Sequence, residues 1–204
     1  MRTPCAARPR SGGFTLIEAL IALSITAVLV AVAVPGIEPL LSQRRLLAAT
    51  SDFVAAVRAA QVEAIRRNRT VEVLFVAGPA TAATVTTATA VASGAAAGRM
   101  TRVVNPQGAA DFVAGANPTG GPARVSIDAG GVRSIAFTPT GRPLDYTAAP
   151  GAALAAPVVV RFTDAPSTRR LCAVVSTGGS TRVCDPARPA GEPQACPSTL
   201  PAPC

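Results

Sequence analysis

The sequence predicts an α+β protein: a long N-terminal helix, the first half of it transmembrane, packed on an antiparallel β domain. Three observations support this prediction. An apolar run extends from Phe14 to Val34, and the following segment, up to Asn68, repeats its apolar residues at the helical period. The remainder consists of short β-like segments separated by Gly and Pro clusters. With 204 residues, the chain has room for one globular domain beyond the helix.

The N-terminal segment has the pattern of a membrane anchor. Residues 1–13 are basic and not apolar, whereas the run from Phe14 to Val34 carries Glu18 as its only charge. As a helix rising ~1.5 Å per residue, this run would extend about 31 Å, enough to cross the hydrocarbon core of a bilayer. It is longer than the apolar region of an ordinary secretory signal. The arginines that precede it predict a cytoplasmic N-terminus and a periplasmic or extracellular remainder.

Glu18 is the unusual residue of this run, because a carboxylate in an apolar helix needs compensation. One interpretation is that its side chain reaches the lipid headgroups. The other requires cleavage between Gly13 and Phe14, which would create a positive α-amine on Phe14. The amine of a neighbouring chain could then neutralise Glu18 inside the membrane and set the register between subunits.

The stretch from Gly13 to Glu18, Gly-Phe-Thr-Leu-Ile-Glu, resembles the type III signal of type IV prepilins and type II secretion pseudopilins. The resemblance implies cleavage after Gly13 by prepilin peptidase, N-methylation of Phe14, and pairing of Glu18 with the N-terminus of another subunit. It also implies an inner-membrane location and other pilins or pseudopilins as partners. Pro35 and Pro39, just beyond the apolar run, match the same family.

From Leu40 the pattern becomes that of an amphipathic helix. Asn68 is suited to a left-handed cap, and arginines lie beside this negative end of the helix. The segment Leu47–Val73, with its Ala-Ile-Arg-Arg-Asn run, resembles the GspH/FimT subgroup of minor pseudopilins. The predicted apolar face consists of Leu46, Leu47, Phe53, Val54, Val57, Ala60, Ala64 and Ile65.

Beyond Asn68 we expect β structure. Val71, Val73 and Phe75 alternate with their neighbours as in a strand with one buried face. The region 80–97 is interpreted as an edge strand plus a flexible loop. The segment 137–142 resembles a recurring stretch of the same subgroup, and we interpret Gly141 as a hairpin turn. Further strands are expected at 82–91, 99–104, 124–128, 133–138, 157–163, 170–176 and 180–184.

Four of the five cysteines lie near the C-terminus, and Cys5 precedes the apolar run. An even number after loss of the leader suits disulfides in an oxidising compartment. Residues 172–184 indicate a hairpin around Gly178. A two-residue loop would oppose Ala173 and Cys184, whereas a three-residue loop would oppose Cys172 and Cys184 within disulfide distance. We favour the second loop. Among the three possible pairings we therefore predict Cys172–Cys184 and Cys196–Cys204.

The residues that are absent exclude several kinds of site. There is no histidine, which excludes a Ser-His-Asp or Cys-His catalytic group and a histidine-ligated zinc site. Neither common spacing of a glycine-rich phosphate loop occurs. We therefore expect no catalytic residue, no metal and no cofactor, and a protein that is not an enzyme.

The basic charge raises the question of a nucleic-acid partner. The net charge is +8, and would be about +5 without residues 1–13. In the FimT branch a C-terminal Gly-Arg-x-Arg motif is implicated in binding DNA, but the corresponding stretch here, residues 178–182, keeps only Arg182. Arg169, Arg170 and Arg188 could enlarge the patch. We interpret these arginines as a solvated basic surface; the alternative implied by the resemblance is binding of double-stranded DNA, which would act through the DNA backbone and be salt-sensitive and sequence-independent.

The resemblance to the type IV pilin-like family predicts a minor pseudopilin or minor pilin, a structural subunit of a type II secretion pseudopilus or of a type IV pilus. The alternative is a FimT-like minor pilin that binds DNA for uptake. Five segments are expected: a prepilin leader (1–13), a transmembrane half-helix (14–35), an amphipathic half-helix (36–69), a periplasmic β domain (70–185) and a Pro- and Cys-rich tail (186–204).

Overall fold

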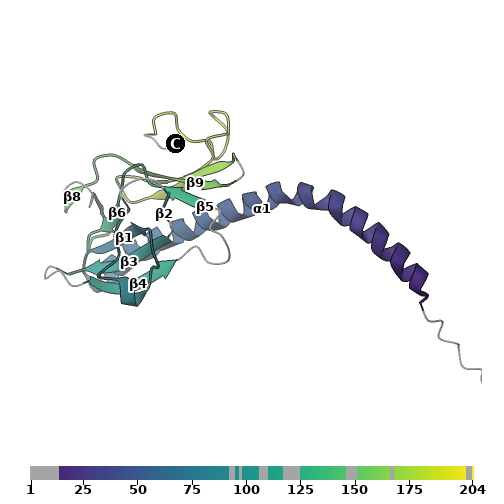
Figure 1. Ribbon diagram of the computed structural model, residues 1–204. Helices are drawn as coiled ribbons and strands as arrows, with labels where there is room; N and C mark the ends of the chain where they lie inside the picture. The colour runs from purple at the N-terminus through teal and green to yellow at the C-terminus, as the bar shows by residue number, and fades with distance from the viewer. Residues whose placement is uncertain are drawn as a thin grey trace, which may run out of the picture. The chain divides into compact units, whose positions relative to one another are not determined.

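In the computed structural model the chain forms two compact units, Met1–Leu40 and Leu41–Cys204, and helix α1 (Leu16–Arg67) runs from the first into the second (Figure 1). The predicted leader, with Cys5 and Gly13, lies outside the described residues, as do the side chains of residues 32–36, which fall in the predicted transmembrane half. The structure describes residues 14–91, 95–96, 98–105, 110–116, 125–145, 151–165, 168–200 and 204.

The first unit contains the beginning of α1. Two residues, Phe14 and Thr15, precede the helix. Every described side chain from Phe14 to Ala31 is exposed within the single chain. Among the described parts of the chain, no helix combines the length and the apolar character needed to cross a membrane.

The second unit is built on the C-terminal half of α1, which ends as the sequence predicts. Asn68 takes the left-handed conformation, with φ of 51°. Its N–H donates to the Ile65 carbonyl, and the N–H of Arg69 donates to the Ala64 carbonyl. These two bonds form a Schellman motif, which satisfies the last carbonyls of the helix and turns the chain into the first strand.

Two antiparallel sheets complete the second unit. The six-stranded sheet has the order β4-β3-β1-β6-β7-β8 and the five-stranded sheet the order β11-β10-β9-β5-β2. Strands of the first sheet are β1 (Val71–Val76), β3 (Gly98–Val104), β4 (Ala110–Ala116), β6 (Ser134–Phe137), β7 (Pro143–Asp145) and β8 (Ala152–Ala153). Strands of the second are β2 (Ala95–Ala96), β5 (Val125–Asp128), β9 (Val158–Asp164), β10 (Arg170–Val175) and β11 (Thr181–Cys184).

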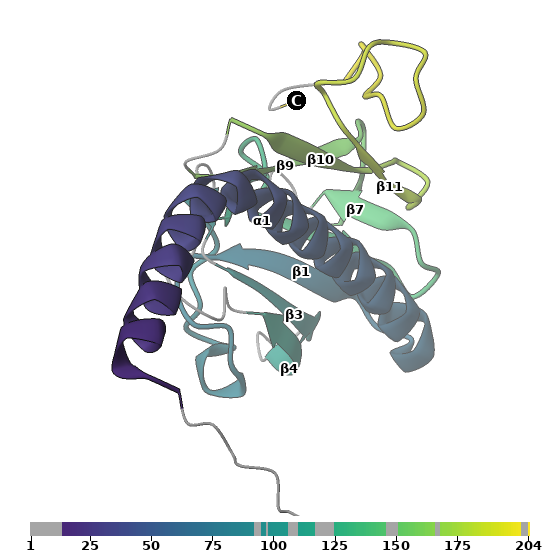
Figure 2. The same cartoon turned by 90° about the vertical axis from the view of Figure 1, so that its right-hand side faces the viewer.

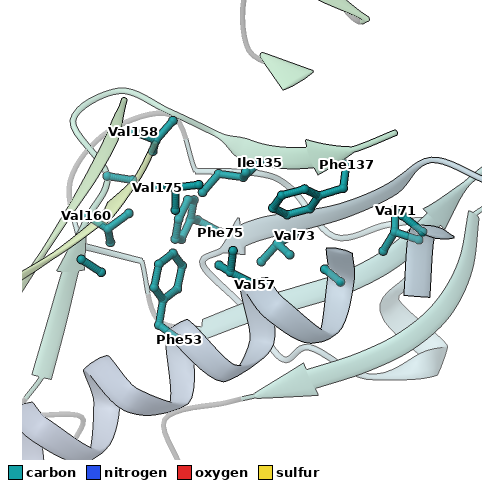
Figure 3. Packing of buried hydrophobic residues seen from close by; sticks show 14 of the residues in the cluster. Phe53, Val57, Val71, Val73, Phe75, Ile135, Phe137, Val158, Val160 and Val175 are labelled. Carbon is teal, nitrogen blue, oxygen red and sulfur yellow. The ribbon is translucent and has the colours of Figure 1, made fainter. Parts of the chain in front are cut away.

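One core joins the helix to both sheets, so the predicted α+β class, with a helix packed on an antiparallel β domain, is confirmed (Figures 2 and 3). Phe53 of α1 lies at its centre, with ring centroids 6.0 Å from Phe75 of β1 and 5.7 Å from Phe162 of β9. Leu47 and Ile65 of the predicted apolar face are exposed instead. The buried helix residues of this core are Leu46, Phe53, Val57, Ala60 and Ala64.

Seven of the expected strands are confirmed, but the strand expected at 82–91 is wrong. This segment contains a short 3-10 helix (Ala82–Thr84) and touches the sheet only through a bridge from Ala90 to Val76. It packs over Leu74, Val76 and Met100, on the face of the sheet opposite the helix. Strand β1 is consequently buried on both faces rather than one. The strand at the edge beside β3 is β4, which the sequence pattern did not indicate, and β8 forms the other edge.

The C-terminal hairpin has the predicted register. The N–H of Ser176 donates to the Ser180 carbonyl, the loop is centred on Gly178, and Cys172 lies opposite Cys184. Hydrogen-bonded pairs alternate with non-hydrogen-bonded pairs along antiparallel strands. Counting from Ser176, the two cysteines form a hydrogen-bonded pair, the type in which facing side chains lie farther apart.

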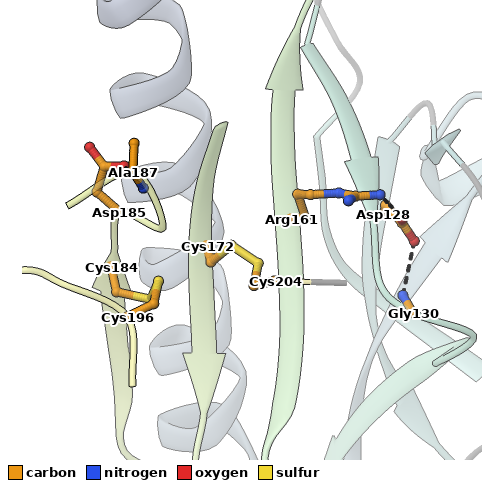
Figure 4. The surroundings of a disulfide bond; sticks show 9 residues. All are labelled: Asp128, Gly130, Arg161, Cys172, Cys184, Asp185, Ala187, Cys196 and Cys204. Carbon is orange, nitrogen blue, oxygen red and sulfur yellow. Dashed lines mark hydrogen bonds and ion pairs between the residues drawn. A yellow bond between two sulfur atoms is a disulfide. The ribbon is translucent and has the colours of Figure 1, made fainter. Parts of the chain in front are cut away.

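The predicted disulfide pairing is wrong. The bonds join Cys172 to Cys204 and Cys184 to Cys196, so each hairpin cysteine pairs with the tail (Figure 4). The tail folds back along the hairpin, where Asp185 N–H donates to the Gln194 carbonyl. Its side chains Cys196, Leu200 and Cys204 then cover Val159 and Val174 on the outer face of the sheet. Covering this apolar face brings the tail sulfurs to the hairpin cysteines.

Candidate assembly and binding sites

The start of α1 is fixed by a side-chain cap. The hydroxyl of Thr15 accepts a hydrogen bond from the Glu18 N–H at 3.3 Å, and the Thr15 carbonyl accepts one from Ala19. The pattern Thr-x-x-Glu is a capping-box sequence, and a carboxylate in the first turn is favoured by the helix dipole. Thr15 thereby caps the helix through the Glu18 backbone; its role was not predicted from the sequence, although the Thr-x-x-Glu pattern could have revealed it. No cation pairs with the Glu18 carboxylate among the described residues.

The exposed helix that follows is suited to apolar surroundings. Its two hydroxyl side chains bond within the helix: Ser24 donates to the Ile21 carbonyl at 2.8 Å and Thr26 to the Ala22 carbonyl at 2.7 Å. Neither hydroxyl therefore needs water. Small side chains form one stripe of the surface, where close approach of a second helix is possible. The stripe comprises Ala19, Ala22, Thr26, Ala27 and Ala31, and the larger side chains of Phe14, Leu23 and Val30 line the same surface.

Within the second unit, Gln61 of α1 joins the two sheets. Its side-chain amide donates to the Gly141 carbonyl at 2.8 Å, in the β6–β7 turn. The predicted turn is confirmed, since Gly141 has φ of 78°. Gly179, in the hairpin loop of the other sheet, has φ of 87° and packs so closely that a Cβ there would lie 3.0 Å from the Gln61 nitrogen. No sequence signal indicates this contact, which joins segments far apart in the chain.

A buried carboxylate marks the other end of the helix–sheet contact. The side chain of Asp164, at the end of β9, is 0% exposed, and Arg45 of α1 lies 3.6 Å from it. Neither Asp164 oxygen has a hydrogen-bond partner among the described residues. Ser42, one turn before Arg45, also has a buried hydroxyl without a described partner. This ion pair therefore connects the helix to the five-stranded sheet, and burial of the carboxylate away from water carries a desolvation cost that Arg45 offsets.

The last turn of α1 carries a second ionic group. Glu63 accepts hydrogen bonds from the Arg66 guanidinium at 2.7 Å and from Arg67. These bonds lower the pKa of Glu63 from 4.5 to about 2, and the pKa of Arg66 is raised by the same contact. The arginines also lie at the negative end of the helix dipole, which favours their charge.

The lowered pKa of Glu63 predicts a pH-dependent effect of Glu63→Gln. A carboxyl with a depressed pKa in the folded state contributes stability above its ordinary pKa, and this contribution is lost as the pH falls through about 2. Because the pair is at the surface, we expect Glu63→Gln to lower the Tm by no more than about 2 °C at pH 7. At pH 2 the two proteins should melt together. Arg58→Gln, on the exposed face of the same helix, is the control, and a Glu63→Gln effect that persists unchanged at pH 2 contradicts the assignment.

The arginines considered for DNA binding lie near both ends of β10, with Arg169 and Arg170 at its start and Arg182 beside its end, and in the tail, where Arg188 pairs with Glu192. The guanidinium of Arg169 donates to the side-chain carbonyl of Gln43 on α1 at 2.9 Å. Arg170 and Arg182 are both exposed, on neighbouring strands. However, Arg182 lies opposite Val174, four positions along β10 from Arg170, or about 13 Å at ~3.3 Å per residue. The tail covers the sheet between them through Cys172.

Among the described residues no three Cys, Asp or Glu side chains gather in a way that could hold a metal ion.

Comparison with known proteins assigns the two units of the chain to separate sequence profiles. The profile of the prokaryotic N-terminal methylation motif matches residues 8–34. That of the type II transport protein GspH matches residues 49–179, more than half of the chain. The chain belongs to the GspH family. The GspH match includes α1 from Ala49 onward, the six-stranded sheet and every strand of the other sheet except β11, and it ends at Gly179 in the hairpin loop, before the disulfide-linked tail.

Solved structures similar to this GspH-family protein include the type IV minor pilin FimU of Pseudomonas aeruginosa strain PAO1. One FimU crystal form has 15% identity and a TM-score of 0.48, covering 76% of this chain and 96% of FimU. A second form has 16% identity and a TM-score of 0.45, covering 74% of this chain and 99% of FimU. No match is found among curated proteins. The family membership supports a minor pilin or pseudopilin, a structural subunit.

Proposed function

We propose that this GspH-family protein is a minor pseudopilin or minor pilin that enters a type II secretion pseudopilus or a type IV pilus, with a structural rather than a catalytic role. The run from Phe14 to Val34 anchors it in the bacterial inner membrane. This run continues past Ala31, the last of its side chains that the structure describes. The N-terminus is cytoplasmic, and the unit Leu41–Cys204 is periplasmic.

Processing removes residues 1–13. The methylation-motif match supports cleavage after Gly13 by prepilin peptidase and N-methylation of Phe14. Phe14 is 86% exposed and precedes the capped helix, so the new terminus does not disturb α1. Intact-mass analysis of the chain from the membrane fraction tests this step. Loss of residues 1–13 with one added methyl group supports it, whereas a full-length mass in an assembled filament contradicts it.

Docking through Glu18 is carried by one observation: the capped helix start holds a single carboxylate on a surface that is otherwise apolar and uncovered. A carboxylate surrounded by hydrocarbon is costly unless it meets a cation. The α-amine of a processed neighbour, on its Phe14, supplies that charge. The stripe of small side chains beginning at Ala19 lets the two helices approach closely enough to pair.

Replacing Glu18 tests this docking. Glu18→Leu leaves the Thr15 cap intact, because the cap uses the Glu18 backbone N–H, and it makes membrane insertion easier. We expect Glu18→Leu and Glu18→Gln to reduce incorporation into sheared or cross-linked filaments about tenfold or more. A loss of ~1.4 kcal/mol in docking free energy is enough for a tenfold reduction. Ser24→Ala is the matched control, because Ser24 lies outside the stripe of small side chains and its hydroxyl donates to the Ile21 carbonyl of its own helix. Normal incorporation of Glu18→Leu contradicts the docking role, while normal incorporation of Glu18→Gln alone assigns it to hydrogen bonding rather than charge.

Deletion of the gene distinguishes the two filament systems. Lost secretion of extracellular hydrolases, restored by complementation, assigns the protein to type II secretion, whereas normal secretion assigns it to a pilus. The DNA-binding alternative has less support, because Arg169 contacts Gln43 and the tail separates Arg170 from Arg182. It requires a salt-sensitive gel shift of double-stranded DNA that Arg182→Ala weakens. Absence of a shift at low salt removes this alternative.

A further inference from the structure

The two disulfides of the C-terminal region are nested. Cys172–Cys204 spans 32 positions and encloses Cys184–Cys196, which spans 12 (Figure 4). The sulfurs of the hairpin lie on neighbouring strands, and each bonds outward to the tail rather than to the other. The final pairing therefore differs from the one that joins each cysteine to its nearest neighbour along the chain.

Chain statistics favour the pairing of neighbours. The frequency with which a flexible loop closes falls with the 3/2 power of its length. Cys196 and Cys204 are only 8 positions apart, so their encounter in an unfolded chain is about eightfold more frequent than that of Cys172 with Cys204. In a chain with four cysteines, the first bond determines the second. When all six possible first bonds are weighted in this way, the consecutive pairing is expected about twice as often as the nested pairing.

Local structure strengthens the same bias. The β10–β11 hairpin closes through a three-residue loop, and its register places Cys172 opposite Cys184. Hairpins form in microseconds, before longer-range contacts are made. The tail reaches the hairpin only after its own chain reversal, where Asp185 bonds to Gln194. A bond between Cys172 and Cys184 is thus favoured before Cys204 arrives.

We infer that the protein reaches its native pairing through thiol–disulfide exchange, and that it is a substrate for a partner dithiol, a thiol–disulfide isomerase. The partner thiolate attacks Cys184 in the Cys172–Cys184 bond, forms a mixed disulfide and releases the Cys172 thiolate. That thiolate attacks Cys204 in the Cys196–Cys204 bond and releases the Cys196 thiolate. Cys196 then attacks the mixed disulfide at Cys184 and regenerates the partner thiolate. Three exchanges convert consecutive pairs into nested pairs with no net oxidation.

Burial sets the time at which the partner acts. Cys172 is 0% exposed and Cys184 is 2% exposed once the tail covers them. Attack on either sulfur requires access, so the exchange takes place before the tail packs on Val159 and Val174. The packed tail then protects the nested bonds and removes them from further exchange.

The experiment uses the full chain in detergent micelles with Cys5→Ser, which leaves four cysteines. The reduced, unfolded chain is diluted into buffer containing diamide, an oxidant that leaves no free thiol, and half is then given reduced glutathione as the exchange thiol. Trypsin and an endoprotease that cuts before aspartate place Cys172, Cys184 and the two tail cysteines on three separate peptides, 171–182, 183–184 and 185–204. Consecutive pairs give a two-peptide species, whereas nested pairs give one three-peptide species, with the individual bonds located by fragmentation.

We expect the two-peptide species to exceed the nested three-peptide species, identified by fragmentation, about twofold or more with diamide alone, and glutathione to convert it to the nested form. The matched control carries Cys184→Ser and Cys196→Ser, which leaves one possible bond; it should form Cys172–Cys204 without glutathione, whether or not the variant folds. Predominance of nested pairs in diamide alone overturns the inference. Persistence of consecutive pairs in glutathione overturns the inference as well, because that result would show that the nested pairing is the less stable of the two.

Discussion

Phe53→Ala is expected to lower the free energy of unfolding by about 3–5 kcal/mol, the usual cost of removing a fully buried Phe. Phe53 is 0% exposed, and its ring contacts Phe75 of one sheet (Figure 3). It also contacts Phe162 of the other sheet. Truncation leaves a cavity where helix and both sheets meet, and these rigid elements limit its collapse. The aromatic pairs, each worth about 0.5–1.5 kcal/mol beyond burial, are lost with it.

The measurement is thermal unfolding of the full chain in detergent, followed by circular dichroism. For a unit of this size we expect the Tm to fall by roughly 6–20 °C. Val62→Ala is the matched control, since Val62 is on the same helix but 63% exposed, and should change stability by less than about 0.5 kcal/mol. Equal effects of the two substitutions would show that Phe53 is not the centre of the core.

The helical parts of the fold could be predicted because their signals are local. The spacing of Phe53, Val57, Ala60 and Ala64 encodes the buried face directly, and Asn68 supplies the left-handed residue that ends the helix. Leu47 and Ile65, which were predicted to belong to the buried face but are exposed, lie at the margins of that face. There a periodic pattern does not tell which of two adjacent apolar residues is covered.

The sheet was less predictable because its burial depends on segments distant in sequence. Alternation in β1 indicated one buried face, but residues 80–90 return to cover the other, and only the fold brings them there. The same region resembles a strand because Thr, which favours strands, is frequent in it, yet tertiary packing overrides this propensity. Strand β4 was missed because Ala and Gly interrupt its pattern; a Cβ at Gly115 would lie 2.0 Å from the Ala80 carbonyl oxygen.

The candidate sites divide in the same way. The motif from Gly13 to Glu18 is a contiguous signal, and the methylation-motif match covers it. Gln61, Arg45 and Asp164 carry no local signal, because each is defined by a partner in another element. The hairpin register was correct while the disulfides were not, since register is set by the loop, whereas pairing depends on where the tail packs.

The Arg45–Asp164 pair leads to a prediction whose two single substitutions differ in size. Arg45→Ala leaves a fully buried carboxylate without its described cation, and breaking a buried pair in this way costs about 3–5 kcal/mol. Asp164→Ala leaves Arg45, which is 36% exposed and can turn its charge into solvent. We expect the second substitution to cost only about 1 kcal/mol, in the range of an ordinary substitution.

The double variant decides between an ionic and a packing role for Arg45. If the cost of Arg45→Ala comes from the uncompensated charge, then adding Asp164→Ala should recover about 2 kcal/mol or more, since the charge is no longer there. Denaturant unfolding of the four proteins at pH 7 gives the coupling energy. Additive losses would mean instead that the aliphatic stem of Arg45 stabilises the helix–sheet contact by packing. In that case Arg45→Met should restore the stability, whereas under the ionic account Arg45→Met should be as unstable as Arg45→Ala.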